Sequence, residues 1–211
     1  MKSLLYKTFL LFVIMLPCIG CKAHDGVFEI HEINSDIFGR IYGKSYKADC
    51  TVPVEDLRYL IVTHYDGDGN VVRGEIICNV AIADDLIDIF RNLYQAQYPI
   101  ESIRLIDEFE ADDIKSMQAN NTSCFNFRKI AGSKKLSKHA RGLAIDINPL
   151  YNPYVKGSTV SPEEGRPYAN RRKDFPYKID ENDLCYKEFI AHGFKWGGSW
   201  NSLKDYQHFE K

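Results

Sequence analysis

The pattern of hydrophobic and polar residues predicts a β-hairpin in the first half of the chain. Residues 57–65 are rich in Leu, Ile, Val and Tyr, and residues 71–80 contain many β-branched side chains, as strands do. The residues between them, 66–70, are Asp, Gly and Asn, which favour a tight turn. Two strands joined by so short a turn are typical of an antiparallel pair.

Helical periodicity follows the hairpin. Apolar residues recur every three or four positions from Ile82 to Tyr94, which predicts an amphipathic helix packed on the sheet, with Asp84 and Asp85 in its first turn. Further along, the pattern predicts a strand at residues 102–106 and helices at residues 111–117 and 183–192. This mixed order, without regular alternation of strand and helix, predicts an α+β fold: a small, mainly antiparallel sheet flanked by helices.

The N-terminus has the pattern of an export signal. Lys2 and Lys7 supply positive charge, and the apolar run at residues 9–16 is too short to span a bilayer. The residues up to Cys21 resemble the end of a bacterial lipoprotein signal, which would make Cys21 a lipidated residue. The alternative is an ordinary secretory signal cut after Ala23. Both interpretations predict an exported protein, periplasmic or in the cell envelope, and the first adds a lipid anchor to the membrane.

Composition limits the classes of partner. The chain has 211 residues, 45% of them hydrophobic, which is enough to bury a full core in a single domain. Its net charge of −2 lacks the basic surplus of a nucleic-acid-binding protein, so no nucleic-acid partner is expected. We expect the protein to be a monomer.

Four cysteines follow the export signal: Cys50, Cys78, Cys124 and Cys185. In an exported protein an even number of cysteines permits disulfides, and pairing of Cys50 with Cys78 and of Cys124 with Cys185 would link neighbouring segments. The alternative is four buried free thiols. No Cys-x-x-Cys pair exists, so neither a zinc-ribbon nor a thioredoxin-like site is indicated.

Two segments in the second half of the chain hold the residue types of a catalytic zinc site. The first contains His139 and Asp146, and the second, near the C-terminus, contains Asp205 and His208. A catalytic zinc ion takes three protein ligands, keeps an open position for water, and works with a base that accepts a proton from that water. His139, Asp146 and His208 are the candidate ligands, and Asp205 is the candidate base.

Alternation along each segment indicates how these side chains face one another. Apolar residues at positions 143, 145 and 147 alternate with Ala, Asp and Asn, so a strand would bury the apolar set and turn Asp146 to the opposite face. Asp205 lies three residues before His208 and cannot share its face along one straight strand, so we expect Asp205 at a bend just before that strand. The same alternation gives His208 and Glu210 one face and Phe209 the other.

From residue 120 onward the chain resembles a family of bacterial peptidases. These are the zinc D-alanyl-D-alanine carboxypeptidases and dipeptidases, including vancomycin-resistance enzymes, with the L-alanyl-D-glutamate endopeptidases of phage endolysins (peptidase family M15). The family motif Ser-x-His-x-x-Gly-x-Ala-x-Asp is matched in full by Ser137, His139, Gly142, Ala144 and Asp146. A second motif, an acidic residue three positions before His, is matched by Asp205 and His208.

The resemblance implies zinc ligands at His139, Asp146 and His208, with Asp205 as the general base. It also implies that Arg128 faces the substrate, where a guanidinium can stabilise an oxyanion or hold a carboxylate. The alternative for Arg128 is a surface salt bridge.

Three more residues are candidates for substrate binding. Ser137 can hydrogen-bond the peptide or brace the loop that holds His139. Trp196 and Trp200, in a glycine-rich segment before Asp205, offer flat contact surface or pack around the site. The glycines of that segment are expected to permit close approach of the substrate.

The resemblance implies a hedgehog/DD-peptidase-like domain over residues 54–211, after the signal at residues 1–23 and an N-terminal lead-in at residues 24–53. Residues 24–50 mix polar and apolar positions and are expected to be irregular. It implies a zinc-dependent peptidase that hydrolyses peptidoglycan stem peptides. A D-alanyl-D-alanine carboxypeptidase is expected first, because Arg128 or Arg141 can recognise the free carboxylate of such a substrate. The alternatives are an L-alanyl-D-glutamate endopeptidase, hydrolysis of another envelope amide, and a non-catalytic wall-binding lipoprotein of the same fold.

Overall fold

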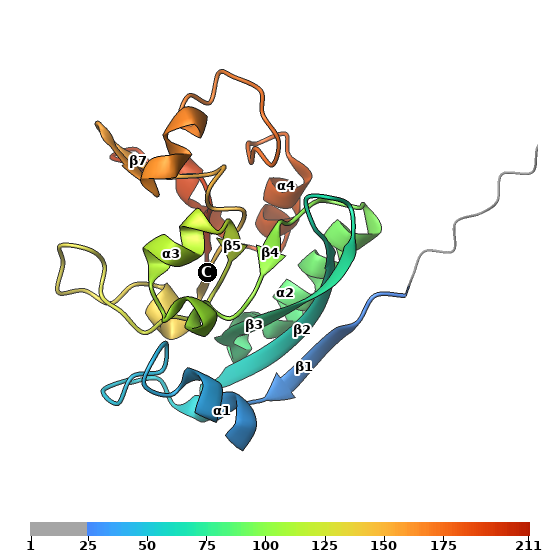
Figure 1. Ribbon diagram of the computed structural model, residues 1–211, viewed down its shortest axis with the longest axis vertical. Coiled ribbons are helices and arrows are strands. Elements are labelled where there is room, and N and C mark those ends of the chain that lie inside the picture. The colour runs from blue at the N-terminus through green and yellow to red at the C-terminus, as the bar shows by residue number, and fades with distance from the viewer. Residues whose placement is uncertain (1–24) are drawn as a thin grey trace, which may run out of the picture.

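The computed structural model describes residues 25–211 (Figure 1). The expected export signal, residues 1–23, and the candidate lipidation site Cys21 lie outside the described residues. Within the described part of the chain, no helix has the length and apolar character needed to cross a membrane.

Short helices and strands follow one another in irregular order. The α-helices are α1 (Ser35–Ile41), α2 (Val80–Gln95), α3 (Asp113–Gln118) and α4 (Leu184–Ala191). The 3₁₀-helices are η1 (Val54–Asp56), η2 (Ile106–Phe109), η3 (His139–Arg141), η4 (Glu163–Tyr168) and η5 (Gly197–Ser199). The strands are β1 (Phe28–Glu32), β2 (Leu57–Tyr65), β3 (Val71–Asn79), β4 (Ser102–Ile103), β5 (Asn121–Thr122), β6 (Ala144–Asp146), β7 (Tyr154–Lys156), β8 (Thr159–Ser161), β9 (Lys195–Trp196), β10 (Lys204–Asp205) and β11 (His208–Glu210).

The described strands form four small sheets rather than one. Three sheets have three strands each, in the orders β1-β2-β3, β10-β7-β8 and β6-β11-β9, and β4 pairs with β5 in the fourth. Every ladder between these strands is antiparallel except the one that joins β4 and β5. This arrangement confirms the α+β class and the mainly antiparallel pairing.

The longest ladder is the predicted hairpin. β2 and β3 pair along their whole length, with Leu57 opposite Asn79 and Tyr65 opposite Val71. The helix α2 lies along one face of this sheet (Figure 1). Its apolar side chains are buried in the main hydrophobic core with side chains of the hairpin, as the helical periodicity predicts.

The start of α2 differs from the prediction. The helix begins at Val80, and the side chain of Asn79 caps it by accepting a hydrogen bond from the backbone N–H of Ala81 at 3.0 Å. Asp84 and Asp85 therefore lie beyond the first turn, and the expectation that they interact there with the helix dipole is wrong. Asn79 supplies the acceptor that the helix N-terminus needs, so no acidic residue is required in the first turn.

The expectation that residues 24–50 are irregular is also wrong, because this segment contains β1 and α1. β1 pairs with β2 along its whole length, although most of its side chains are exposed and the apolar–polar alternation that marks it in the sequence spans only residues 28–31. The helix α1 buries Ile37 and Ile41 in a second hydrophobic core, which also contains Phe125 and Phe127. The N-terminal part of the described chain thus packs against the segment that precedes Arg128.

Three further expected elements are present with shifted bounds. The strand expected at residues 102–106 is limited to β4, because η2 begins at Ile106. The helices expected at residues 111–117 and 183–192 are α3 and α4. α4 has Asp183 as its N-cap, with the side chain accepting a hydrogen bond from the N–H of Cys185 at 2.9 Å.

The helix α4 supports the C-terminal strand. Phe189 of α4 stacks on Phe209 of β11, with ring centroids 4.2 Å apart and an interplanar angle of 16°. Both rings are fully buried in the main core. Because Phe209 faces the core, the neighbouring residues of β11 turn to the opposite face, as the alternation of the sequence predicts.

The four described cysteines are free thiols. The favoured pairing of Cys50 with Cys78 and of Cys124 with Cys185 is therefore wrong, and the alternative of free thiols holds. Burial raises the pKa of Cys78, Cys124 and Cys185, so these thiols stay protonated and unreactive. They act as small apolar side chains of the core.

The packing of α1 leads to a stability prediction. Ile41 is fully buried, so Ile41→Ala is expected to lower the free energy of unfolding by about 2–5 kcal/mol. Ile30→Ala, in the same N-terminal segment but 36% exposed, is expected to cost less than about 1 kcal/mol. Urea denaturation of both variants measures the difference. Equal small losses would show that the N-terminal segment does not share the core.

Candidate metal centre

The pairing of β6 with β11 brings two candidate ligands together. In this antiparallel ladder Asp146 lies directly opposite His208, and Phe209 lies opposite Ile145. Directly opposed residues of an antiparallel pair project to the same face of the sheet. Asp146 and His208 therefore share one face, while the apolar residues beside them face the core.

The third candidate ligand enters from a tight turn before β6. His139 begins η3, and Gly142 ends it with a φ of +66°, in the left-handed region that favours glycine. A Cβ atom on Gly142 would lie 2.6 Å from the backbone nitrogen of Asn79. The turn that directs His139 back toward Asp146 thus depends on a glycine at this position.

The ligand atoms of these three residues converge. His139 Nε2 lies 3.2 Å from His208 Nδ1 and 3.3 Å from Asp146 Oδ2, and His208 Nδ1 lies 3.0 Å from Asp146 Oδ1. Ligand atoms about 2.0–2.2 Å from a tetrahedral zinc ion are about 3.3–3.6 Å apart. The observed separations are close to these values, so the three side chains fit one small tetrahedral cation.

Hydrogen bonds on the outer side of each ring determine which nitrogen can bind a metal. His139 Nδ1 lies 2.7 Å from the carbonyl oxygen of Cys124, which can only accept, so Nδ1 carries the proton and Nε2 is free. His208 Nε2 lies 3.4 Å from Glu210 Oε2, which leaves Nδ1 to face the cluster. Such outer partners hold metal-binding imidazoles in the required tautomer.

The cluster needs a positive charge at its centre. Burial alone would raise the pKa of Asp146, but the imidazoles of His139 and His208 hold it well below its usual value. Burial lowers the pKa of His208, but its contacts with Asp146 and Glu210 outweigh this effect and raise that pKa to about 10. A proton therefore occupies the cluster when no metal does, and a bound cation would replace it.

Asp205 lies beside the cluster without being part of it. It ends β10 and pairs with Tyr154 of β7, and the chain then turns before β11 begins at His208. This agrees with the expectation that Asp205 does not lie on the strand of His208. The side chain of Gln207 donates a hydrogen bond to Asp205 Oδ1 at 3.2 Å. Burial, together with the negative charge of Asp146, raises the pKa of Asp205 to about 6.

Gly197, in the glycine-rich segment before β10, packs on Asp205. A Cβ atom on Gly197 would lie 2.6 Å from the carbonyl oxygen of Asp205 and 2.8 Å from its Cβ. Gly197 thus permits close approach of its own chain to Asp205, while close approach of a substrate to the segment stays a prediction.

The three candidate substrate-binding residues have different surroundings in the structure. Trp200 lies next to the cluster, with its ring centroid 5.3 Å from that of His208. Trp196 is only 6% exposed and lies in the main core, where its indole N–H donates to the carbonyl oxygen of Tyr206 at 2.9 Å, so it matches the packing alternative. Ser137 is buried, and its Oγ accepts a hydrogen bond from the N–H of His139 at 3.2 Å, which matches the bracing alternative.

The backbone of Arg128 is hydrogen-bonded to the ligand loop, by which we mean residues 137–142, the segment that holds His139. The carbonyl oxygen of Arg128 accepts a hydrogen bond from the N–H of Ser137 at 3.1 Å. Its guanidinium forms an ion pair with Asp113, at the start of α3. The side chain is partly buried and is not one of the atoms that converge at the cluster.

Sequence reasoning missed several residues that shape the site. Glu210 had a signal, since alternation placed it on the face of His208, but no role was assigned to it. Gln207, Asp113 and Asn126 had none, because their side-chain contacts form only when separate segments meet in the folded chain or when the chain turns, and no periodic pattern marks them.

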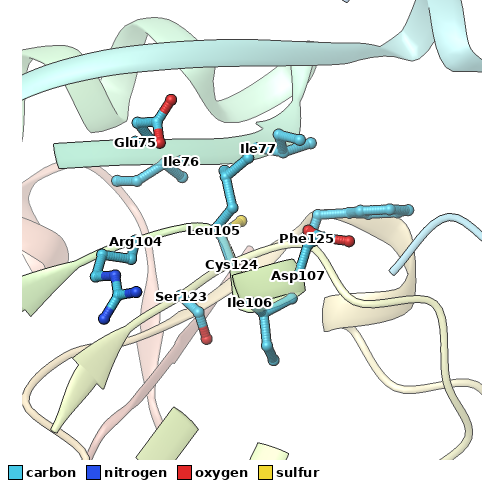
Figure 2. A pocket seen from close by; sticks show the side chains of 10 residues that line it. All are labelled: Glu75, Ile76, Ile77, Arg104, Leu105, Ile106, Asp107, Ser123, Cys124 and Phe125. Carbon is cyan, nitrogen blue, oxygen red and sulfur yellow. The ribbon is translucent and has the colours of Figure 1, made fainter. Parts of the chain in front are cut away.

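Two cavities of the described chain have no candidate metal ligand in their walls. One of them lies between β3 and the segments at residues 104–107 and 123–125, whose side chains are drawn in Figure 2. Its volume is about 10 Å³, enough for a single water molecule. Its wall includes Cys124, whose carbonyl oxygen binds His139. A larger cavity of about 390 Å³ lies between residues 98–99 and 174–183, and no candidate site residue lines it.

Residues 131–211 match the family model described as D-alanyl-D-alanine carboxypeptidase, in peptidase family M15. The matched segment contains the three candidate ligands and Asp205, and begins after Arg128. No curated protein and no solved structure matches the chain. Over residues 131–211 the match confirms the resemblance to M15 peptidases that the sequence motifs indicate.

The cluster leads to a prediction of metal binding. Asp146→Ala and His208→Ala are each expected to reduce zinc affinity by more than the roughly 10- to 100-fold that follows loss of a supporting hydrogen bond. Asp205→Asn is expected to retain zinc, because Asp205 is not among the converging ligands. Native mass spectrometry and metal analysis measure the stoichiometry, with His192→Ala as a control. Full zinc content in Asp146→Ala would contradict the ligand assignment.

Proposed function

We propose that this chain, whose residues 131–211 match the D-alanyl-D-alanine carboxypeptidase family of peptidases, is a zinc-dependent peptidase acting on peptidoglycan stem peptides. The observation that best supports the proposal is the convergence of His139, Asp146 and His208 within 3.0–3.3 Å of one another, with Asp205 beside them. Two imidazole nitrogens and one carboxylate are donors that suit catalytic zinc.

The chain's own residues would supply the proton transfers. When bound, zinc would provide the Lewis acidity that activates water and polarises a peptide carbonyl. Asp205, with a pKa raised to about 6, can accept the proton of the attacking water and return it to the leaving amine near neutral pH. The hydrogen bond from Gln207 to Oδ1 restrains the orientation of the Asp205 carboxylate.

Arg128 is our candidate for recognition of the substrate's charge. A guanidinium carries five N–H donors and pairs well with a carboxylate or with the oxyanion of a tetrahedral intermediate. Because a carboxypeptidase must recognise a free terminal carboxylate, this residue favours removal of a terminal D-alanine over cleavage inside the stem peptide. Trp200 would cover the side of the cluster nearest His208.

The proposed setting follows from the substrate. The export pattern of the N-terminal residues and the candidate lipidation site Cys21 are consistent with an enzyme of the periplasm or cell envelope. We propose that it acts as a monomer. We propose no nucleic-acid partner. The complete set of ligands and base supports an enzyme rather than a non-catalytic wall-binding protein, which would not need Asp205.

Replacement of the base is expected to abolish turnover. Asp205→Asn keeps the size of the side chain but removes the proton acceptor, so kcat should fall about 10²- to 10⁴-fold with zinc retained. Mass spectrometry of pentapeptide muropeptides measures the product: loss of one alanine indicates a D,D-carboxypeptidase, and cleavage at L-Ala–D-Glu indicates the endopeptidase. Asp68→Asn, in the exposed hairpin turn, is the control. Undiminished cleavage by Asp205→Asn would contradict the mechanism.

The pKa of Asp205 predicts the pH profile. The carboxylate must be deprotonated to accept a proton, so kcat/KM is expected to rise with pH and to level off above about pH 6. A cation in the cluster lowers the pKa of a neighbouring carboxylate, so the acid limb should lie at or below this value. Steady-state kinetics from pH 4 to pH 8 would test this, and activity that increases on acidification would rule Asp205 out as the base.

A further inference from the structure

One segment of chain connects the metal cluster with Arg128. Next to β5, Ser123 and Asp146 exchange backbone hydrogen bonds of 2.9 and 3.2 Å. The carbonyl oxygen of Cys124 binds the ring of His139, and the backbone N–H of Asn126 donates to the carbonyl oxygen of His139 at 3.1 Å. Residues 123–128 therefore run alongside the ligand loop and end at Arg128.

The guanidinium of Arg128 is held at one edge. Its Nε atom is buried and lies against Asp113 Oδ2 in an ion pair that lacks hydrogen-bond geometry. The other oxygen, Asp113 Oδ1, accepts a hydrogen bond from the side-chain amide of Asn126 at 2.9 Å, and the same amide donates to the carbonyl oxygen of Ala111 at 3.2 Å. The two oxygens of Asp113 thus have different partners, and Asn126 links this carboxylate to the ligand loop.

This ion pair differs from the other arginine–carboxylate pairs of the described chain. The side chains of Arg128 and Asp113 are 28% and 27% exposed, and in each of the other pairs the arginine is more exposed than Arg128 and the acidic residue is more exposed than Asp113. The pair at Arg166 and Glu163, by comparison, has side chains 51% and 69% exposed and joins residues three apart. Solvent screens the attraction between the two charges less in this partly buried pair than in an exposed one. The pair also joins α3 to a residue 15 positions further along the chain.

The backbone around Arg128 is also supported from the N-terminal part of the chain. The N–H of Phe127 donates to the carbonyl oxygen of Ser45 at 2.9 Å, and Lys47 Nζ donates to the carbonyl oxygen of Phe127 at 2.9 Å. Phe127 itself is buried in the second core beside α1. These contacts fix the position of the Arg128 backbone. Only the conformation of its long side chain is then left to be fixed by other contacts.

We propose that Asp113, oriented by Asn126, is a positioning residue that fixes the Arg128 guanidinium for contact with an anionic group of the peptide substrate. This inference rests on the proposed function, in which Arg128 meets a carboxylate or an oxyanion. The ion pair occupies the Nε edge, so the Nη donors remain for the substrate. A guanidinium held in place before binding loses less conformational freedom when the substrate arrives.

The test compares Asp113→Asn with the wild-type protein in the zinc-loaded full chain. Loss of the charge is expected to lower kcat/KM for pentapeptide muropeptides about 10- to 100-fold, as misplacement of a substrate-positioning group does. Zinc content and melting temperature should stay near the wild-type values. Asp113→Glu, which restores the charge, should recover part of the loss. Glu163→Gln, which breaks the exposed pair with Arg166, is the matched control and should leave kcat/KM unchanged.

A double-mutant cycle separates positioning from a general structural effect. If Asp113 acts through Arg128, then Asp113→Asn should have no further effect in an Arg128→Ala background. An equal loss in both backgrounds, or wild-type kcat/KM in Asp113→Asn, overturns the inference while the proposed function stands. Absence of cleavage by the zinc-loaded wild-type protein overturns the proposed function and this inference with it.

Discussion

The candidate site depends on the register between β6 and β11. Because Asp146 lies directly opposite His208, a carboxylate and an imidazole reach the same point from two strands that are 62 residues apart in the chain. A shift of one residue would turn one of them into the core and bring an apolar side chain to the surface. The buried Phe209, stacked on Phe189 of α4, makes such a shift costly, so hydrophobic packing under the sheet maintains the geometry above it.

The cluster is assembled from acceptors that require a cation. Cys124 and Glu210 hold the outer nitrogens of the two imidazoles, so two ring nitrogens and the Asp146 carboxylate direct their lone pairs at one point. In a buried position such an arrangement is unfavourable unless a proton or a metal ion compensates it. Asp205 remains outside this group because the chain turns after β10, and its raised pKa reflects both burial and the nearby negative charge of Asp146.

The sequence predicted those elements whose periodic pattern extends over many neighbouring residues. It did not predict features that depend on contacts between distant segments. The hairpin and α2 were identified because alternation and helical periodicity each extend over many residues. β1 was missed because its alternation spans only residues 28–31, and its membership of the sheet rests on backbone pairing with β2. The cysteine pairing failed for a related reason: proximity along the chain does not determine which thiols meet in space.

For the site, the residue types together with the resemblance to the family motifs predicted His139, Asp146 and His208 as ligands. Alternation predicted that Phe209 is buried and that Asp205 does not lie on the strand of His208. Both kinds of signal are contained in short segments of the sequence. Long-range packing settled the remainder: the ring nitrogens that face the cluster, the burial of Trp196 and the pairing of Arg128 with Asp113. Each of these depends on contacts between segments that meet only after the chain has folded, and no local pattern encodes them.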